Sequence, residues 1–102
     1  MVLFLRKDLE LLYTTGKRKG DYKGLDQKIV DKFKSMVSTM ELYEKETDFW
    51  SIPSWRYEKL DHGYSSVRIN DKYRLIMRVV MADDCIMIEE IGLEEINNHY
   101  AK

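Results

Sequence analysis

Positions 64–75 of this 102-residue chain read Tyr64-Ser65-Ser66-Val67-Arg68-Ile69-Asn70-Asp71-Lys72-Tyr73-Arg74-Leu75. The pattern predicts two strands, over residues 64–69 and 73–81, joined by a polar turn at residues 70–72. Arg68 and Arg74 stand on the strands themselves. A guanidinium keeps its charge and matches carboxylate or phosphate oxygens with a fork of N–H donors. The segment therefore predicts a β-hairpin that carries cationic groups.

Further strands are expected on both sides of this hairpin. Residues 55–60 alternate with a period of two, and residues 85–91 form another β-rich run after a turn at residues 82–84. Short polar turns between such runs are typical of an antiparallel meander. Cys85 lies in an apolar stretch, so we expect it to be a small buried residue. Residues 93–100 fit either a short helix or an extended edge strand.

Two helices are predicted before the strands. A first apolar stripe ends near Gly16, which is suited to terminate a helix; it contains Leu5, Leu9, Leu12 and Tyr13. A second stripe predicts an amphipathic helix over about residues 23–40; it contains Leu25, Ile29, Phe33, Met36, Val37 and Met40. Pro53 argues against regular structure in residues 41–54, which we expect to pack on the core through Trp50, Ile52 and Trp55.

These elements predict one α+β domain over residues 1–102. An N-terminal helical hairpin would pack on a twisted antiparallel sheet of three to five strands. No apolar run approaches the roughly 20 residues that span a bilayer, and the first residues lack a secretory pattern. With a single cysteine, the chain fits a reducing compartment. We therefore expect a cytoplasmic protein that does not engage a membrane.

The net charge of −1 conceals an alternating pattern along the chain. Residues 1–34 carry +4, residues 35–62 carry −3, residues 63–81 carry +3 and residues 82–102 carry −5. A basic face can attract phosphates, whereas the total charge argues against a free-standing, high-affinity nucleic-acid binder. Ordinary solvated surfaces of both signs are the alternative interpretation.

Metal and cofactor chemistry is not indicated. His62 and His99 lack metal-ligand spacing, and Cys85 lies apart from both. Neither a glycine-rich phosphate loop nor a Ser-His-Asp arrangement is visible. We expect no metal and no cofactor.

Longer motifs resemble the RelE/ParE superfamily of bacterial toxins. They are Trp55-Arg56-Tyr57-Glu58-Lys59-Leu60 and the run from Gly63-Tyr64 to Leu75, in the order helix, helix, strands. The segments Leu12-Tyr13, Gly16, Gly20 and Ile52-Pro53-Ser54-Trp55-Arg56 are most similar to the HigB branch. The pair His99-Tyr100 is similar to the C-terminus of the YoeB branch. The resemblance covers nearly the whole chain.

The resemblance implies the toxin of a type II toxin–antitoxin pair that acts as a ribosome-dependent mRNA endonuclease. In that chemistry a base removes the proton of a 2′-hydroxyl, and the oxygen attacks the adjacent phosphate. An acid then protonates the leaving 5′-oxygen, and no metal takes part. The implied partners are the ribosome, mRNA and a HigA-like antitoxin with a helix-turn-helix.

Carried over by motif, the catalytic residues are Glu58, Arg74, His99 and Tyr100. Glu58 would be the base and Arg74 the phosphate clamp. His99 would be the acid, and Tyr100 would position the substrate or stack on a base. Further contacts to RNA phosphates would come from Arg56, Lys59 and Arg68.

Two alternatives remain open on the sequence. Glu58 and Arg74 can instead form structural ion pairs across the sheet. The chain can also be a non-catalytic binding protein on the same fold, such as a ParE-like gyrase inhibitor or a degenerate toxin held by its antitoxin. Asp61, at a place where the family often has lysine, and the acidic total favour this second function.

Overall fold

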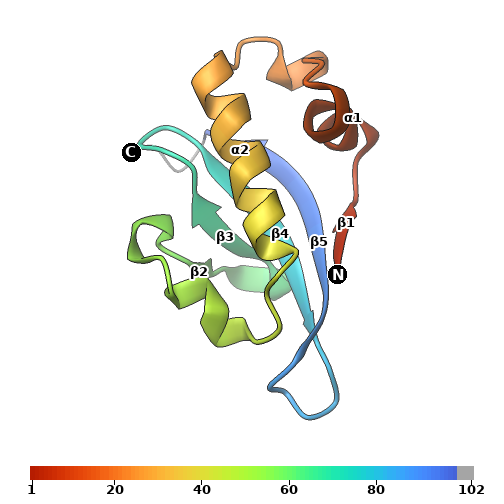
Figure 1. Cartoon of the computed structure of the whole chain (residues 1–102), viewed down its shortest axis with the longest axis vertical. Helices are drawn as coiled ribbons and strands as arrows, with labels where there is room; N and C mark the ends of the chain where they lie inside the picture. The colour runs from red at the N-terminus through yellow and green to blue at the C-terminus, as the bar shows by residue number, and fades with distance from the viewer. Residues whose placement is uncertain (99–102) are drawn as a thin grey trace.

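Two α-helices and a five-stranded mixed sheet form the computed structural model of the chain, which describes residues 1–98 (Figure 1). The helices are α1 (Lys7–Thr15) and α2 (Gln27–Met40). The strands are β1 (Val2–Phe4), β2 (Glu58–Lys59), β3 (Ser65–Arg68), β4 (Arg74–Met81) and β5 (Ile88–Asn97). Short 3₁₀ turns are η1 (Gly20–Tyr22), η2 (Glu46–Trp50), η3 (Pro53–Trp55) and η4 (Asp61–Gly63). The α+β class and the order of helices before the main sheet are confirmed.

The strands lie in the order β1-β5-β4-β3-β2, and α2 crosses one face of this sheet (Figure 1). Every neighbouring pair is antiparallel except β1 and β5, which run parallel. The expectation of a purely antiparallel sheet missed this edge strand. Its three residues were too few to show a period, and the first helix therefore begins at Lys7 rather than at Leu5. No helix within residues 1–98 has the length and apolar character needed to cross a membrane.

Helix α2 supplies the largest part of the core from the helical layer. Its buried face holds Ile29, Val30, Phe33, Met36, Val37 and Met40. The helix begins later than expected, because Asp26 caps it: the Asp26 carboxylate accepts a hydrogen bond from the Ile29 N–H at 3.0 Å. Leu25 is buried before the helix starts, which explains why the apolar pattern extended too far upstream.

The segment between α2 and the hairpin contains little regular strand. The strand expected over residues 55–60 is reduced to Glu58–Lys59, because η3 ends in Arg56 with a left-handed φ of +46°. Trp55 is buried and Ile52 packs on the core as expected, whereas the Trp50 side chain is 51% exposed. Pairing with the sheet therefore begins only two residues after Arg56.

The last strand resolves the ambiguity of the C-terminal segment in favour of extended backbone, since β5 continues to Asn97. The strand begins at Ile88, three residues after the expected start. Cys85 lies in the preceding turn with φ of +59° and is exposed, so the expectation of a buried cysteine is wrong. The apolar neighbours that suggested burial belong to the turn; Ile86 is 59% exposed.

A polar network ties η2 to the edge of the sheet. The Tyr57 hydroxyl donates to the Glu46 carboxylate at 2.9 Å and lies 3.1 Å from the Ser65 hydroxyl. The Tyr57 ring stacks on Phe49 with centroids 4.5 Å apart. Lys59 forms a 3.0 Å ion pair with the same Glu46 carboxylate. These contacts fix the short strand β2, which its two ladder positions alone would hold weakly.

We predict that Asp26→Ala lowers the free energy of unfolding by about 1 kcal/mol, because the Ile29 N–H loses its acceptor. Asp26→Asn keeps a capping oxygen and should remain within a few tenths of a kcal/mol of the wild type. Urea unfolding followed by circular dichroism measures both values. Equal losses in the two variants would contradict the capping role.

A second prediction concerns alkaline pH. Burial raises the pKa of the Tyr57 hydroxyl, so the folded protein keeps this proton after the unfolded chain has lost it. Above pH of about 10, the wild type should lose unfolding free energy relative to Tyr57→Phe by about 1.4 kcal/mol per pH unit. Below that pH the difference should be constant. Urea unfolding of both proteins from pH 8 upward provides the comparison, and parallel curves would contradict a buried, protonated Tyr57.

Candidate functional site

The sheet face opposite α2 carries polar side chains from three adjacent strands. Glu58 of β2 is paired with Ser66 of β3, and Ser66 is paired with Ile76 of β4. Arg74 lies two positions before Ile76, so its side chain emerges on the same face. This alternation brings Glu58, Ser66 and Arg74 together where the helical layer does not cover the sheet.

Arg74 is the most constrained of these groups. Its Nε donates to the Ser66 hydroxyl at 2.9 Å, and its Nη2 donates to the Arg56 carbonyl at 2.8 Å. The Glu58 carboxylate lies 3.7 Å from the same Nη2. The Arg74 side chain is only 13% exposed, while that of Glu58 is 59% exposed. A guanidinium held by hydrogen bonds therefore meets a solvent-exposed carboxylate.

The left-handed backbone conformation of Arg56 places its carbonyl oxygen next to the Arg74 guanidinium. A residue with φ of +46° is uncommon outside glycine, asparagine and aspartate. Here it turns the chain from η3 into β2 while its carbonyl accepts the hydrogen bond from Arg74. The backbone at Arg56 and the Arg74 guanidinium thus stabilise each other's position.

An acidic pocket of about 610 Å³ opens on the Glu58 side. Its lining residues are Glu58, Lys59, Leu60, Asp61, His62, Tyr64, Ile76, Glu94, Glu95 and Asn97. Four of the ten are carboxylic acids, and the apolar members form part of the wall. The carboxylates of this pocket would favour a neutral or cationic group over an anion.

A basic hollow of about 270 Å³ opens on the Arg74 side. It is lined by Arg56, Arg68, Asn70, Asp71, Lys72 and Arg74, so four cations face one carboxylate. Cationic donors at this density attract phosphate oxygens. Glu58 and Arg74 therefore lie at the boundary between an acidic and a basic region.

The structure brings together part of the set expected from the sequence. Arg56, Arg68 and Arg74 share the basic hollow, and Glu58 contacts Arg74. Lys59 is instead engaged with Glu46 of η2. His99 and Tyr100 lie outside the described residues; their roles stay predictions.

Ser66 was not predicted as a site residue, although it is completely buried beneath Arg74. The signal for Ser66 in the sequence was weak. It is the second of two adjacent serines at the start of a predicted strand that continues with Val67 and Arg68. His62 is exposed in the η4 turn and lines the acidic pocket. Its carbonyl accepts a 3.2 Å hydrogen bond from Arg78, whose guanidinium lies 3.9 Å above the Tyr64 ring centroid. Arg78 thereby fixes the turn that forms one wall of the pocket.

Within residues 1–98, no three histidine, cysteine, aspartate or glutamate side chains are grouped as metal ligands. No protein-family model matches the chain, and no curated protein sequence matches it.

Solved structures do match it. A YoeB/ParE toxin from Agrobacterium tumefaciens superposes with a TM-score of 0.57 at 19% identity, over 97% of this chain and 98% of that chain. A chain of the YoeB-YefM complex from Staphylococcus aureus gives a TM-score of 0.56 at 21% identity, over 98% and 97% of the two chains. The chain described here therefore shares the fold of YoeB/ParE toxins over nearly its whole length.

Proposed function

We propose that this chain is the toxin of a type II toxin–antitoxin pair and that it cleaves mRNA on the ribosome. The observation that carries the proposal is the contact between Glu58 and Arg74 at the boundary of the basic hollow. Attack by a 2′-hydroxyl requires two groups on one side of the phosphate. One is a proton acceptor, and the other is a cation that binds the phosphate. The fold shared with YoeB/ParE toxins supports the same assignment.

In the proposed mechanism, Glu58 accepts the proton of the 2′-hydroxyl as its oxygen forms a bond to phosphorus. Arg74 donates to the phosphate oxygens whose charge grows in the transition state, and Arg56 and Arg68 add positive potential from the same hollow. The P–O5′ bond breaks, and the 5′-oxygen takes a proton from His99 while Tyr100 positions the substrate. The products are a 2′,3′-cyclic phosphate and a free 5′-hydroxyl, so atoms and protons balance.

The proposed partners are mRNA, the ribosome and an antitoxin. The S. aureus structure holds YoeB in a complex with YefM, which supports an antitoxin partner for a chain of the same fold. The resemblance in sequence adds a HigB-like identity and a helix-turn-helix antitoxin of HigA type. A ribosomal target would place the action in the cytoplasm.

One observation favours the alternative of a non-catalytic binding protein, such as a ParE-like gyrase inhibitor or a degenerate toxin. Glu58, Asp61, Glu94 and Glu95 line the larger pocket, and this charge would repel an RNA backbone that entered it. In that function the Glu58–Arg74 contact would be structural. The two functions differ in whether Glu58 is needed for activity.

We predict that Glu58→Gln lowers mRNA cleavage by about 10²- to 10⁴-fold, the usual contribution of a general base, and abolishes growth arrest. Arg74→Lys should also abolish arrest, because an ammonium cannot reproduce the hydrogen bonds of the guanidinium. Growth after induction and transcriptome-wide mapping of new mRNA 5′ ends measure both effects.

The matched control is Glu89→Gln, an equal charge change at an exposed position near the start of β5. It should arrest growth and cut mRNA like the wild type. Arrest without new 5′ ends would support the binding function instead. Arrest and cuts that persist in Glu58→Gln would show that this carboxylate is not the base.

A further prediction concerns the support of Arg74. Ser66→Ala removes the acceptor of Arg74 Nε, and a misplaced clamp should reduce cleavage by about 10- to 100-fold. Ser35→Ala, an exposed serine on α2, serves as the control and should cut normally. Measurement of antitoxin binding by both variants separates loss of the clamp from loss of the fold. Full activity of Ser66→Ala would mean that Arg74 does not need this hydrogen bond.

A further inference from the structure

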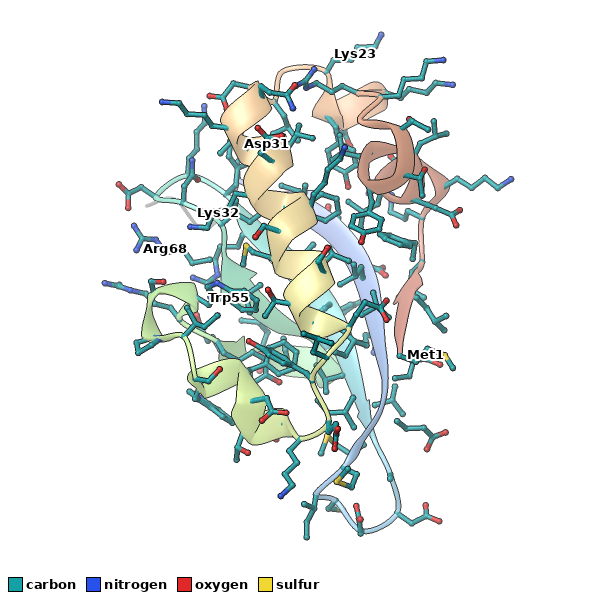
Figure 2. All side chains as sticks on the ribbon, in the orientation of Figure 1. Met1, Lys23, Asp31, Lys32, Trp55 and Arg68 are labelled. Atoms are coloured by element: carbon teal, nitrogen blue, oxygen red, sulfur yellow. The ribbon has the colours of Figure 1, made fainter. Side chains whose placement is uncertain are left out.

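A second basic hollow of about 210 Å³ adjoins the one that contains Arg74. Its lining residues are Lys32, Ser54, Arg68, Ile69, Asn70 and Asp71. The two hollows share Arg68, Asn70 and Asp71, so they are continuous around the Arg68 side chain. Figure 2 shows Lys32 of α2 and Arg68 of β3 on the same margin of the molecule. A cationic surface thus leads from Arg74 across the end of the hairpin to α2.

The charges along this surface are mostly uncompensated. Among residues 1–98, neither Lys32, Arg56 nor Lys72 forms an ion pair with a carboxylate. Arg74 has the Glu58 carboxylate at 3.7 Å, and Arg68 is paired with Asp71 of the β3–β4 turn. The Asp71 side chain is 93% exposed and that of Arg68 is 30% exposed. The exposed Asp71 carboxylate is therefore paired with the Arg68 guanidinium at the point where the two hollows meet.

The turn geometry presents Asp71 for this contact. The Asn70 side-chain oxygen accepts hydrogen bonds from the backbone N–H groups of Lys72 at 2.9 Å and Tyr73 at 2.8 Å. These bonds fix the turn and leave Asp71 at its tip. Because an exposed ion pair is weak, a backbone phosphate, whose single charge equals that of a carboxylate, can compete with Asp71 for Arg68 through charge-assisted hydrogen bonds.

We infer that the RNA strand cleaved beside Arg74 continues over Arg68 to Lys32, and that Asp71 competes with its phosphates for Arg68. This inference rests on the proposed function and adds the path of the substrate backbone and a residue that limits its affinity. The sugar-phosphate backbone fits because it carries one charge per nucleotide, in keeping with cations spaced along a groove.

The test uses a fluorescently labelled 2′-O-methyl RNA of about 12 nucleotides, a length within the range of single-strand sites. This RNA has no 2′-hydroxyl to attack, so fluorescence anisotropy reports binding without cleavage. Lys32→Ala should bind about two- to fivefold more weakly, and its slope of log affinity against log salt should fall by about 0.7. Asp71→Asn should bind about two- to fivefold more tightly at low salt.

The matched control is Lys34→Ala, which removes the same charge from α2. Lys34 lies on another side of the helix, where its Nζ approaches Gly16 at the end of α1. It should leave the salt slope unchanged. Equal effects of Lys32→Ala and Lys34→Ala would overturn the inference, as would wild-type affinity in Asp71→Asn or no measurable binding of RNA by the wild type.

Three further outcomes identify what has failed. If polyglutamate binds and responds to Lys32→Ala while RNA does not, the surface serves an acidic protein segment and the inference is overturned. If mRNA cuts depend on Glu58 but RNA affinity ignores Lys32 and Asp71, the proposed function stands and this path is wrong. If RNA affinity responds to both residues but no cuts depend on Glu58, the path stands and the nuclease function is wrong.

Discussion

The partly buried charge of Arg74 is the constraint around which the open face of the sheet is organised. A guanidinium removed from water must have its donors satisfied, or its burial costs several kcal/mol. The Ser66 hydroxyl and the Arg56 carbonyl meet this need, and both belong to segments that precede Arg74 in the chain. The left-handed backbone at Arg56, the small residue at position 66 and the start of β4 are therefore coupled. Both of these acceptors are neutral, so they orient the guanidinium without cancelling its charge.

The alternating charge along the chain becomes a division of one surface in space. The basic residues of the hairpin line one hollow, while Glu94 and Glu95 of β5 join Glu58 and Asp61 around the neighbouring pocket. The border between them runs between Arg74 and Glu58, whose opposite charges lie 3.7 Å apart. A net charge near zero therefore coexists with strong local fields, which matter more than the total for a phosphate that approaches at short range.

Local patterns in the sequence were sufficient for the elements whose stability is local. The stripe from Ile29 to Met40 predicted α2, and the alternation around residues 70–72 predicted the β3–β4 hairpin, because each places its apolar groups on one face by its own period. The parallel pairing of Val2–Phe4 with Ile91–Leu93 could not be predicted in this way, since it joins distant parts of the chain through three residues. The exposure of Cys85 and the short β2 depend on left-handed backbone at Cys85 and Arg56, which neither residue type signals. For the candidate site, Arg74, Arg56 and Glu58 were predicted from the resemblance, whereas Ser66 required the strand register.

Arg74 and Glu58, which lie at the border between the basic hollow and the acidic pocket, differ in how firmly the fold holds them. Arg74 is fixed by the sheet beneath it, whereas Glu58 stands on a strand of two residues that the Tyr57–Glu46 network anchors from one side. The longer-than-ideal separation of the pair and the exposure of Glu58 mean that a phosphate can take its place beside Arg74 at little cost in stability. Under the proposed function, the carboxylate would then remain solvated and next to the bound phosphate. A rigidly held cation and a less constrained carboxylate are thus a direct consequence of how strongly each strand is bound to the fold.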